Sequence, residues 1–487
     1  MTTTPAPLNF LIISTIILGM INLVVPFFTK EDSKIRNFFL ITVSGFFLIN
    51  IVLIDYLYVN LIDINFTLLN IGNYSIAFGL EPLGLIFLTM IAVLWVPSLL
   101  YTTKFLKINH FLHSSKYLFF VNSCILIGCI VAISANLITM FVAYEILTLC
   151  TIPLIAHHAD KKTLAGLHKY LAILLLSGVV LFLPAIIVIY SKVGSGTFIA
   201  GGFIKQNFSN SASIFLLLAF IFGISKTAIF PLHGWLPAAM VASYPVSALL
   251  HAVIVVKTGL FCIYKILFYV FGLAYLQSLF NDYNWLVILP AITILYSSFL
   301  ALRSSEIKML LAYSTINQIS IALISAFLLT PKGLIAAVIH MVSHSFTKIC
   351  LFYSAGNFYS FKKTYYISDL AGIHKIMPKT SLILLIATLS LIGMPPFAGF
   401  ISKFYIMMAA ADQQNFFVMI ILIFSSIFSF LYMSKIILAI YKPIKNENNI
   451  EKKFLPISMF ISLFLCISFV IGFFFIQKII SIFLTFI

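Results

Sequence analysis

Long apolar segments recur along the whole chain, and they constrain the fold more than any other feature of the sequence. Runs of about 18 or more mainly apolar residues follow one another from Leu8 onward, separated by short polar breaks. Only 9% of the 487 residues are charged, and the mean hydropathy is +1.14. Because a water-soluble core does not have this composition, the sequence predicts an all-α integral membrane protein.

The polar breaks predict about fourteen transmembrane helices. The expected ranges are 8–28, 37–58, 78–101, 117–134, 136–156, 168–191, 211–230, 245–270, 285–302, 307–329, 333–356, 379–409, 416–441 and 455–485. With alternating loops, 19 of the 29 Lys and Arg residues fall on one face, whereas only Lys192, Lys205 and Lys332 fall on the other. The positive-inside rule makes the first face cytoplasmic. We therefore expect a multi-pass protein of a bacterial inner membrane, with both termini on the outer side.

Three further features exclude other classes of protein. The net charge of +16 is explained by the basic loops, so no nucleic-acid partner is expected. No Lys or Arg precedes the first apolar run, which predicts a first span and not a signal peptide. The six cysteines lie in apolar stretches without a CxxC pair, so we expect no disulfide, zinc site, iron–sulfur cluster or other cofactor.

Seven basic residues fall inside predicted spans, where a charge costs about 2.5–3.5 kcal/mol at the bilayer centre. They are Lys226, Lys257, Lys265, Lys348, Lys403, Lys435 and Lys478. Three of them, Lys265, Lys435 and Lys478, lie near span ends, so their side chains are predicted to extend into the membrane interface. The other four have no such explanation.

Acidic and histidine side chains accompany the buried lysines. Glu145 lies within the fifth predicted span, and His251 lies six residues before Lys257 in the eighth. The eleventh span places His340, His344 and Lys348 on one helix face, at i, i+4 and i+8. An HxxxH pair can also bind a metal, but there is no third ligand and a lysine shares the face, so no metal is expected. We call the titratable residues inside the predicted spans that are candidates for proton transfer the polar axis: Glu145, Lys226, His251, Lys257, His340, His344, Lys348 and Lys403.

The polar axis has two interpretations. In the first, its members form isolated ion pairs that pack helices together, but one glutamate cannot neutralise four lysines. In the second, the axis transfers protons. Burial disfavours the charged form of a lysine, a nearby carboxylate favours it, and histidine titrates near neutral pH. The sequence favours proton transfer.

Two predicted spans contain helix breaks beside a lysine. In the twelfth, Pro395 and Pro396 remove the donors that the carbonyls of Leu391 and Ile392 would use, and Gly393 loosens the same turn. In the seventh, Pro231 follows Lys226 by five residues and frees the carbonyl of Thr227. Irregular backbone at membrane depth is tolerated beside protein or water, and paired broken helices are typical of inverted-repeat transporters.

Four stretches of the sequence are long and specific. They are KTAIFPLHGWLPAAMVASYPVSALLHAVIVVKTG (226–259), EIKMLLAYSTINQIS (306–320), IHMVSHSFTKICLFYSAG (339–356) and GMPPFAGFISKFYI (393–406). The chain resembles the proton-conducting antiporter family from about Glu81 to Tyr441. That family includes antiporter-like subunits of respiratory complex I and the A and D subunits of Mrp-type antiporters. The resemblance implies one membrane domain over 1–487, with inverted five-helix repeats at about 117–270 and 285–441, flanked by helices 1–3 and 14.

Residue roles follow from the resemblance by position. It implies that Glu145 tunes Lys226, that Lys257 connects the two halves, and that His344 lies on the central axis. It also implies that Lys403 faces the outward half-channel. One departure is that many relatives read WLPDA where this chain reads WLPAA, from Trp235, which puts in doubt a role for an acid there.

The resemblance implies a proton-translocating subunit without redox chemistry of its own. We expect first an Mrp D-like subunit of a monovalent cation/proton antiporter, because the chain ends soon after its last predicted span. Its partners would be other membrane subunits, with protons and Na+ or K+ as transported ions. The alternative is an antiporter-like proton-pumping subunit of NADH-quinone oxidoreductase. A scaffold that has lost conduction is a third possibility, which the filled titratable positions disfavour.

Overall fold

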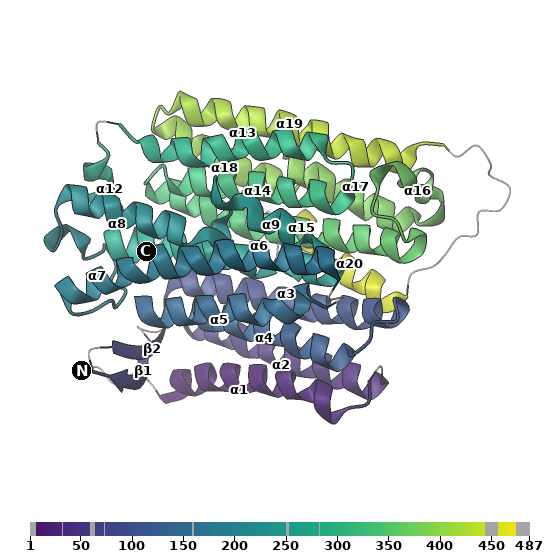
Figure 1. Cartoon of the computed structure of the whole chain (residues 1–487), viewed down its shortest axis with the longest axis horizontal. Helices are drawn as coiled ribbons and strands as arrows, with labels where there is room; N and C mark the ends of the chain where they lie inside the picture. Colours follow the sequence, from purple (N-terminus) through teal and green to yellow (C-terminus); the bar gives the residue numbers. More distant parts are fainter. Residues whose placement is uncertain are drawn as a thin grey trace.

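The structure is a bundle of long helices whose axes run roughly side by side (Figure 1). It is a computed structural model that describes residues 6–31, 33–58, 64–72, 74–157, 160–249, 253–281, 283–443 and 456–473. Within these residues, ten helices are long and apolar enough to cross a membrane. The predicted helical membrane fold is confirmed.

In the described part of the chain, nine spans are uninterrupted helices whose ends lie within about seven residues of the predicted ones; the largest difference is in the third, predicted at 78–101, where residues 78–80 belong to a strand. These helices are α1 (Ala6–Phe28), α2 (Lys34–Tyr58), α3 (Pro82–Ile108), α4 (Ser114–Ala132), α5 (Leu137–Ile155), α13 (Ile288–Arg303), α14 (Ile307–Ala326), α15 (Pro331–Lys362) and α19 (Phe416–Tyr441). The sixth span contains a π-helical segment, η1 (Gly178–Phe182), between α6 (Lys161–Ser177) and α7 (Leu183–Val193).

The other four predicted spans are short or interrupted helices. The seventh consists of α8 (Asn210–Gly223), the 3-10 turns η3 (Ser225–Thr227), η4 (Leu232–Gly234) and η5 (Ala239–Val241), and α9 (Trp235–Ala238). The eighth contains α10 (Tyr244–Ala248), α11 (Val255–Lys265) and η7 (Ile266–Phe271), followed after an 83° bend by α12 (Leu273–Leu279). The twelfth is α17 (Pro378–Ile392) and α18 (Ala398–Asp412), preceded by α16 (Ile373–Ile376), and the last is α20 (Ile457–Ile471). The predicted breaks in spans seven and twelve are therefore confirmed.

The helix count depends on successive loops lying at alternate ends of the bundle. Two hydrogen bonds between loops agree with this alternation. At one end of the bundle, Lys363 Nζ donates to Asn109 Oδ1 at 2.6 Å. At the other end, Asn284 Nδ2 donates to the carbonyl oxygen of Phe327 at 2.7 Å. Each bond joins two loops predicted to share a face, as an even spacing of spans requires.

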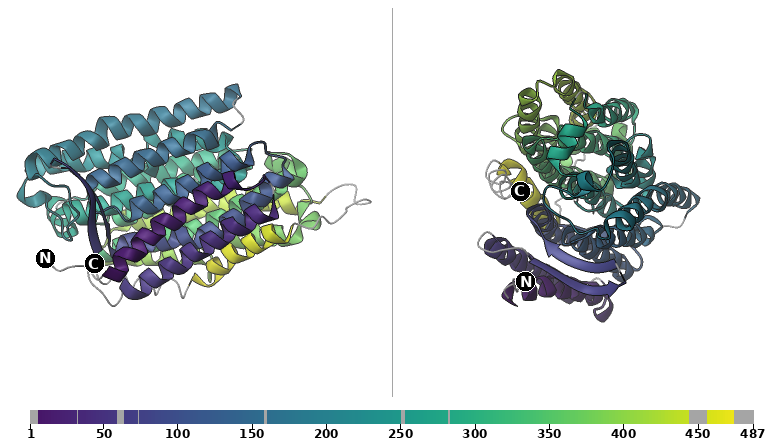
Figure 2. Two further views of the ribbon diagram at one scale, coloured as in Figure 1. Left: turned by 90° about the horizontal axis from the view of Figure 1, so that it is seen from below. Right: turned by 90° about the vertical axis from the view of Figure 1, so that its left-hand side faces the viewer.

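A two-stranded hairpin is an addition that the hydropathy pattern does not indicate. Strands β1 (Ile64–Ile71) and β2 (Tyr74–Leu80) pair in antiparallel register and lie across one end of the bundle (Figure 2). The Gly79 amide donates to the carbonyl of Ile133, and the Ala77 amide donates to Thr139 Oγ1. The hairpin therefore covers the ends of α4 and α5.

Burial separates central from peripheral helices. In the most apolar stretch of α15, 94% of the residues are buried, compared with 28% in α1. Helix α15 packs against α14, α17, α18 and α20. Since α15 carries three members of the polar axis, these polar side chains lie at the centre of the protein.

Candidate functional site

Lys226 lies at the break of the seventh span and is completely buried. Helix α8 ends at Gly223, and the turn η3 turns the Lys226 side chain toward α5. Its Nζ donates to the backbone carbonyl of Tyr144 and lies over the ring of the same residue. The lysine is thus held by the residue that immediately precedes Glu145.

The break itself is stabilised by one side chain from the same span and one from α13. Trp235 Nε1 donates to the carbonyl of Ser225 at 2.9 Å, and the Phe230 amide donates to Thr293 Oγ1 at 3.0 Å. Pro231, predicted to break this helix, lies between η3 and η4. These bonds give the Ser225 carbonyl and the Phe230 amide the hydrogen-bond partners that a continuous helix would have provided. Backbone groups inside a membrane need such partners because no water reaches them.

Glu145 is half-buried on α5, and Lys226 is close enough to interact with it electrostatically. Neither carboxylate oxygen accepts a hydrogen bond of ordinary geometry from a described residue, although both oxygens are inaccessible to solvent. A buried acceptor left without such a bond is costly, and sites of this kind are often functional. The structure therefore places Glu145 beside Lys226 without a direct salt bridge between them.

The two halves of the chain meet at Lys257 and His344. Lys257 Nζ on α11 lies 2.8 Å from Nδ1 of His344 on α15, and both side chains are buried. Helix α11 also packs against the turn that carries Lys226: a Cβ placed on Gly259 would lie 2.7 Å from the carbonyl carbon of Lys226. The eighth span therefore touches both the seventh and the eleventh.

His340 continues this line toward the twelfth span. Its ring is nearly parallel to that of His344, with the centroids 6.2 Å apart and an interplanar angle of 12°. His340 Nδ1 lies 2.9 Å from Ser402 Oγ on α18. Among the described residues, no group of three or more His, Cys, Asp or Glu side chains is placed to hold a metal.

Lys403, the neighbour of Ser402, binds the end of the helix that the prolines interrupt. Its Nζ donates to the carbonyls of Leu391 at 3.1 Å and Ile392 at 2.8 Å. These are the two carbonyls that Pro395 and Pro396 deprive of a backbone donor. Gly393 terminates α17 with φ of +99°, in the left-handed region that favours glycine. A predicted helix break and a predicted site lysine thus form one structural unit.

Lys348 lies on the same helix as the two histidines but binds a different partner. Its Nζ donates to the carbonyl of Leu311 at 3.0 Å and to Ser314 Oγ, both on α14. Lys348 therefore contacts α14, whereas His344 and His340 contact α11 and α18. Of the remaining predicted members, His251 lies outside the described residues.

Lys265 corrects one expectation. Predicted to extend into the membrane interface, it is completely buried and pairs with Glu81 at 3.0 Å. Its Nζ also donates to the carbonyl of Ser134 at 2.5 Å and lies 4.2 Å from the centroid of the Phe198 ring. The hairpin and the loop at Phe198 close over this end of α11, so the end of the apolar run is not the protein surface.

Two basic residues predicted in loops are also buried at helix ends. Arg36 Nη1 donates to Ser114 Oγ at 2.9 Å. Lys308 donates to the carbonyls of Met240 and Ala242. By contrast, Lys435 is half-buried and donates to the carbonyl of Leu302. A count of charges by loop assigns each basic residue to one face of the membrane but does not reveal whether its side chain is buried.

Two contacts of the site were not expected from the sequence. Tyr144 holds Lys226 through a backbone carbonyl, which no sequence pattern reveals, and Ser402 connects α18 to His340. Lys265 could have been found, because Lys257 and Lys265 are eight residues apart and share a helix face, as His340 and Lys348 do.

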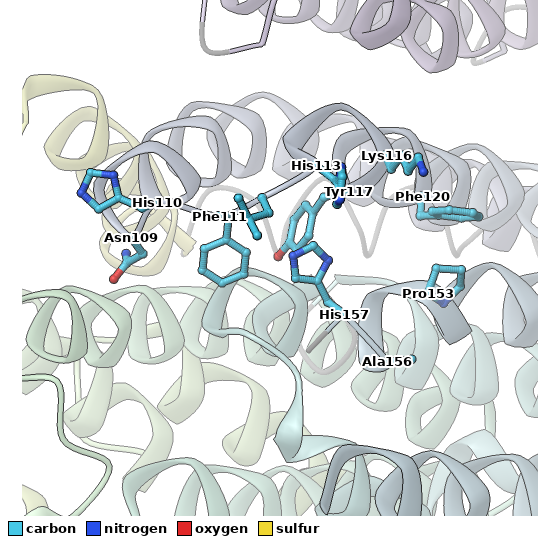
Figure 3. A pocket seen from close by; sticks show the side chains of 11 residues that line it. Asn109, His110, Phe111, His113, Lys116, Tyr117, Phe120, Pro153, Ala156 and His157 are labelled. Atoms are coloured by element: carbon cyan, nitrogen blue, oxygen red, sulfur yellow. The ribbon is translucent and has the colours of Figure 1, made fainter. Parts of the chain in front are cut away.

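A cavity of about 650 Å³ lies elsewhere, between the α3–α4 loop and the end of α5 (Figure 3). Phe111, Tyr117 and His157 gather on one side of it, with ring centroids 5.3–5.9 Å apart. None of the described members of the polar axis lines this cavity, so it is separate from the part of the candidate site that the structure describes.

The arrangement can transfer protons over short steps at membrane depth. A proton given by the Lys257 ammonium to His344 leaves a neutral amine and an imidazolium, and the bond between them already exists. The 6.2 Å between the histidine rings is too long for a direct bond, so that step needs a bridging water or a ring rotation.

Comparisons with known proteins agree with this picture. The family described as NADH:quinone oxidoreductase/Mrp antiporter, TM, matches residues 134–429. A Staphylococcus haemolyticus protein named as antiporter subunit mnhA2 is 29% identical over 78% of this chain and 50% of its own length. The chloroplastic NAD(P)H-quinone oxidoreductase subunit 5 of Acorus calamus is 28% identical over 80% of this chain and 54% of its own. The chain therefore spans about half the length of these relatives.

Two solved structures share the fold. A chain of the membrane-bound sulfane sulfur reductase, an archaeal respiratory membrane complex, superposes with a TM-score of 0.81 and 23% identity, covering 97% of this chain and 96% of that one. A chain of the Mrp complex from Dietzia sp. superposes with a TM-score of 0.78 and 21% identity, covering 96% of this chain and 50% of that one. At these identities the likeness concerns the fold alone.

Proposed function

Because the chain belongs to the NADH:quinone oxidoreductase/Mrp antiporter family of membrane subunits, we propose that it translocates protons along the polar axis. We assign it to a multi-subunit monovalent cation/proton antiporter, in which proton entry drives the export of Na+ or K+. The lipid bilayer and other membrane subunits are its surroundings. The basic loops favour a bacterial inner membrane with both termini outside.

One observation carries the proposal: Lys257, His344, His340 and Ser402 form a buried polar line from α11 through α15 to α18. Two hydrogen bonds, Lys257–His344 and His340–Ser402, lie on either side of the parallel histidine rings. Ionisable residues at this depth are costly and are retained mainly where they serve ion movement. Glu145 and Lys226 lie at the start of this line, and Lys403 lies at its far end. The division into repeats at 117–270 and 285–441 belongs to the same proposal.

A second function is favoured by the subunit 5 relatives, which match this chain as well as the antiporter relative does. In that case the chain pumps protons within an NADH-quinone oxidoreductase-type complex whose partner subunits perform the redox chemistry. The polar axis would act in the same way, but the driving reaction would differ.

The test uses the intact complex in vesicles that contain a pH-sensitive dye. Cation-dependent proton flux in the absence of an electron donor supports antiport, whereas flux that requires a donor and a quinone supports the second function. Glu145→Gln and Lys257→Met should each abolish either flux at normal assembly, because each removes a group that exchanges a proton. Normal flux in both variants would contradict proton transfer along the polar axis.

A further inference from the structure

The sixth span changes helix type opposite Glu145. Between α6 and α7, the segment η1 (Gly178–Phe182) is π-helical, and the Leu183 amide donates to the carbonyl of Gly178, five residues earlier. Pro184 follows at once and cannot supply the amide that the carbonyl of Val180 would accept in an α-helix. A single π turn inside an α-helix commonly accompanies such a break and is frequent at functional sites.

The first residue of this segment touches the Glu145 carboxylate. A Cβ placed on Gly178 would lie 1.9 Å from Oε1 of Glu145 and 3.0 Å from its Cδ. Because real atoms never approach so closely, the carboxylate occupies the space that any other residue at position 178 would fill. At Gly178 the sixth span therefore contacts the Glu145 carboxylate through its backbone, with no side chain in between.

The same segment also contacts the turn that carries Lys226. Ser177 Oγ lies 2.5 Å from Ser225 Oγ, and a Cβ placed on Gly223 would lie 2.6 Å from the Phe182 amide nitrogen. The Phe182 ring packs edge-on against Tyr144, with the centroids 5.6 Å apart. Residues 177–182 therefore contact both Glu145 on α5 and the turn that carries Lys226.

We propose that Gly178 is a positioning residue for proton exchange between Glu145 and Lys226. By lacking a side chain, it lets the carboxylate lie against the sixth span at a fixed place relative to the ammonium. The π-helical segment keeps that surface in register with the Lys226 turn. This inference rests on the proposed function, because it concerns the geometry of the same pair.

Gly178→Ala tests the inference, with Gly45→Ala as the matched control. A Cβ at Gly45, in α2, meets no atom within 4 Å, so the control adds the same methyl group to a membrane helix in open space. Gly178→Ala should fold, because the group in its way is the end of a flexible side chain. Displacing the carboxylate should lower proton flux by about ten- to a hundredfold at matched abundance, while Gly45→Ala stays at the parent level.

A double variant distinguishes positioning from helix packing. Glu145→Asp shortens the acid by one methylene and leaves room for a methyl group at position 178. We expect Glu145→Asp to lower flux in the parent but to raise it in the Gly178→Ala background, so the two effects are not additive. Additive losses, or a Gly178→Ala protein as active as Gly45→Ala, would overturn the positioning role. Normal flux in Glu145→Gln would instead contradict the proposed function at this pair.

Discussion

Lys257 Nζ lies 2.8 Å from Nδ1 of His344, so a lysine of the eighth span and a histidine of the eleventh share one hydrogen bond. This bond joins the two halves of the polar axis. Both side chains are buried, Lys257 on the interrupted eighth span and His344 on the central helix α15. A proton shared between two bases is the simplest arrangement that leaves only one charge there.

Replacement of Lys257 should therefore stop proton transfer between the two halves of the polar axis. Lys257→Met keeps the length of the side chain and removes the proton-binding group, so proton flux in vesicles should fall to background. Lys435→Met is the control, because Lys435 is a half-buried lysine that binds the Leu302 carbonyl outside the line. The role of Lys257 would be contradicted by a Lys257→Met complex with the flux of the control.

Lys403 should tolerate arginine structurally but not functionally. Lys403→Met removes the ammonium that donates to the carbonyls of Leu391 and Ile392, so the free energy of unfolding should fall by about 1–3 kcal/mol. Lys403→Arg keeps donors and charge, but a guanidinium does not release its proton, so flux should stop while stability is retained. Thermal unfolding in detergent and dye-reported flux measure the two effects. An active Lys403→Arg complex would exclude Lys403 as a proton carrier.

The Glu81–Lys265 pair should behave as a largely buried ion pair, because Lys265 is completely buried and the Glu81 side chain is only 19% exposed. Lys265→Met alone leaves the Glu81 charge without its lysine, which should destabilise the protein by up to about 3 kcal/mol, because Glu81 retains some contact with solvent. The double change Glu81→Gln/Lys265→Met removes both charges and should recover most of that loss. Unfolding midpoints of the single and double variants at one pH provide the measurement. Equal midpoints for parent and Lys265→Met would mean that the pair contributes little.

Sidedness can be measured with single cysteines. Lys363→Cys should react only with thiol reagents that reach the cytoplasm, whereas Lys205→Cys should react from outside, because these exposed positions lie on opposite faces by the basic-residue count. The parent protein is the control, since five of its six cysteines are buried and Cys150 is half-buried. Labelling of both variants from the same side would overturn the count of spans between them.

Much of the architecture could be predicted without a structure. The positions of the spans, the breaks beside Lys226 and Lys403, and the carbonyls of Leu391 and Ile392 left without backbone donors all follow from the sequence. Hydrophobic run length and proline chemistry are local properties of the chain. Features that depend on them can therefore be predicted from a single sequence.

The identity of each partner could not be predicted in this way. The helical repeat places His340, His344 and Lys348 on one face of α15, yet the histidines lie toward α11 and α18 whereas Lys348 binds α14. Similarly, the end of an apolar run predicted an interfacial Lys265, but the hairpin and a distant loop cover it.

Run length, proline positions and residue type were enough to predict which segments cross the membrane, where two of them break, and that Lys226, Lys257, Lys348 and Lys403 lie inside spans. The packing of the folded chain was needed to show that Lys403 binds the broken end of α17, that Gly178 faces Glu145, and that Lys265 pairs with Glu81. The physical reason is that helical periodicity orients a side chain only about its own axis. The neighbour that it meets depends on the packing of all the other helices at once.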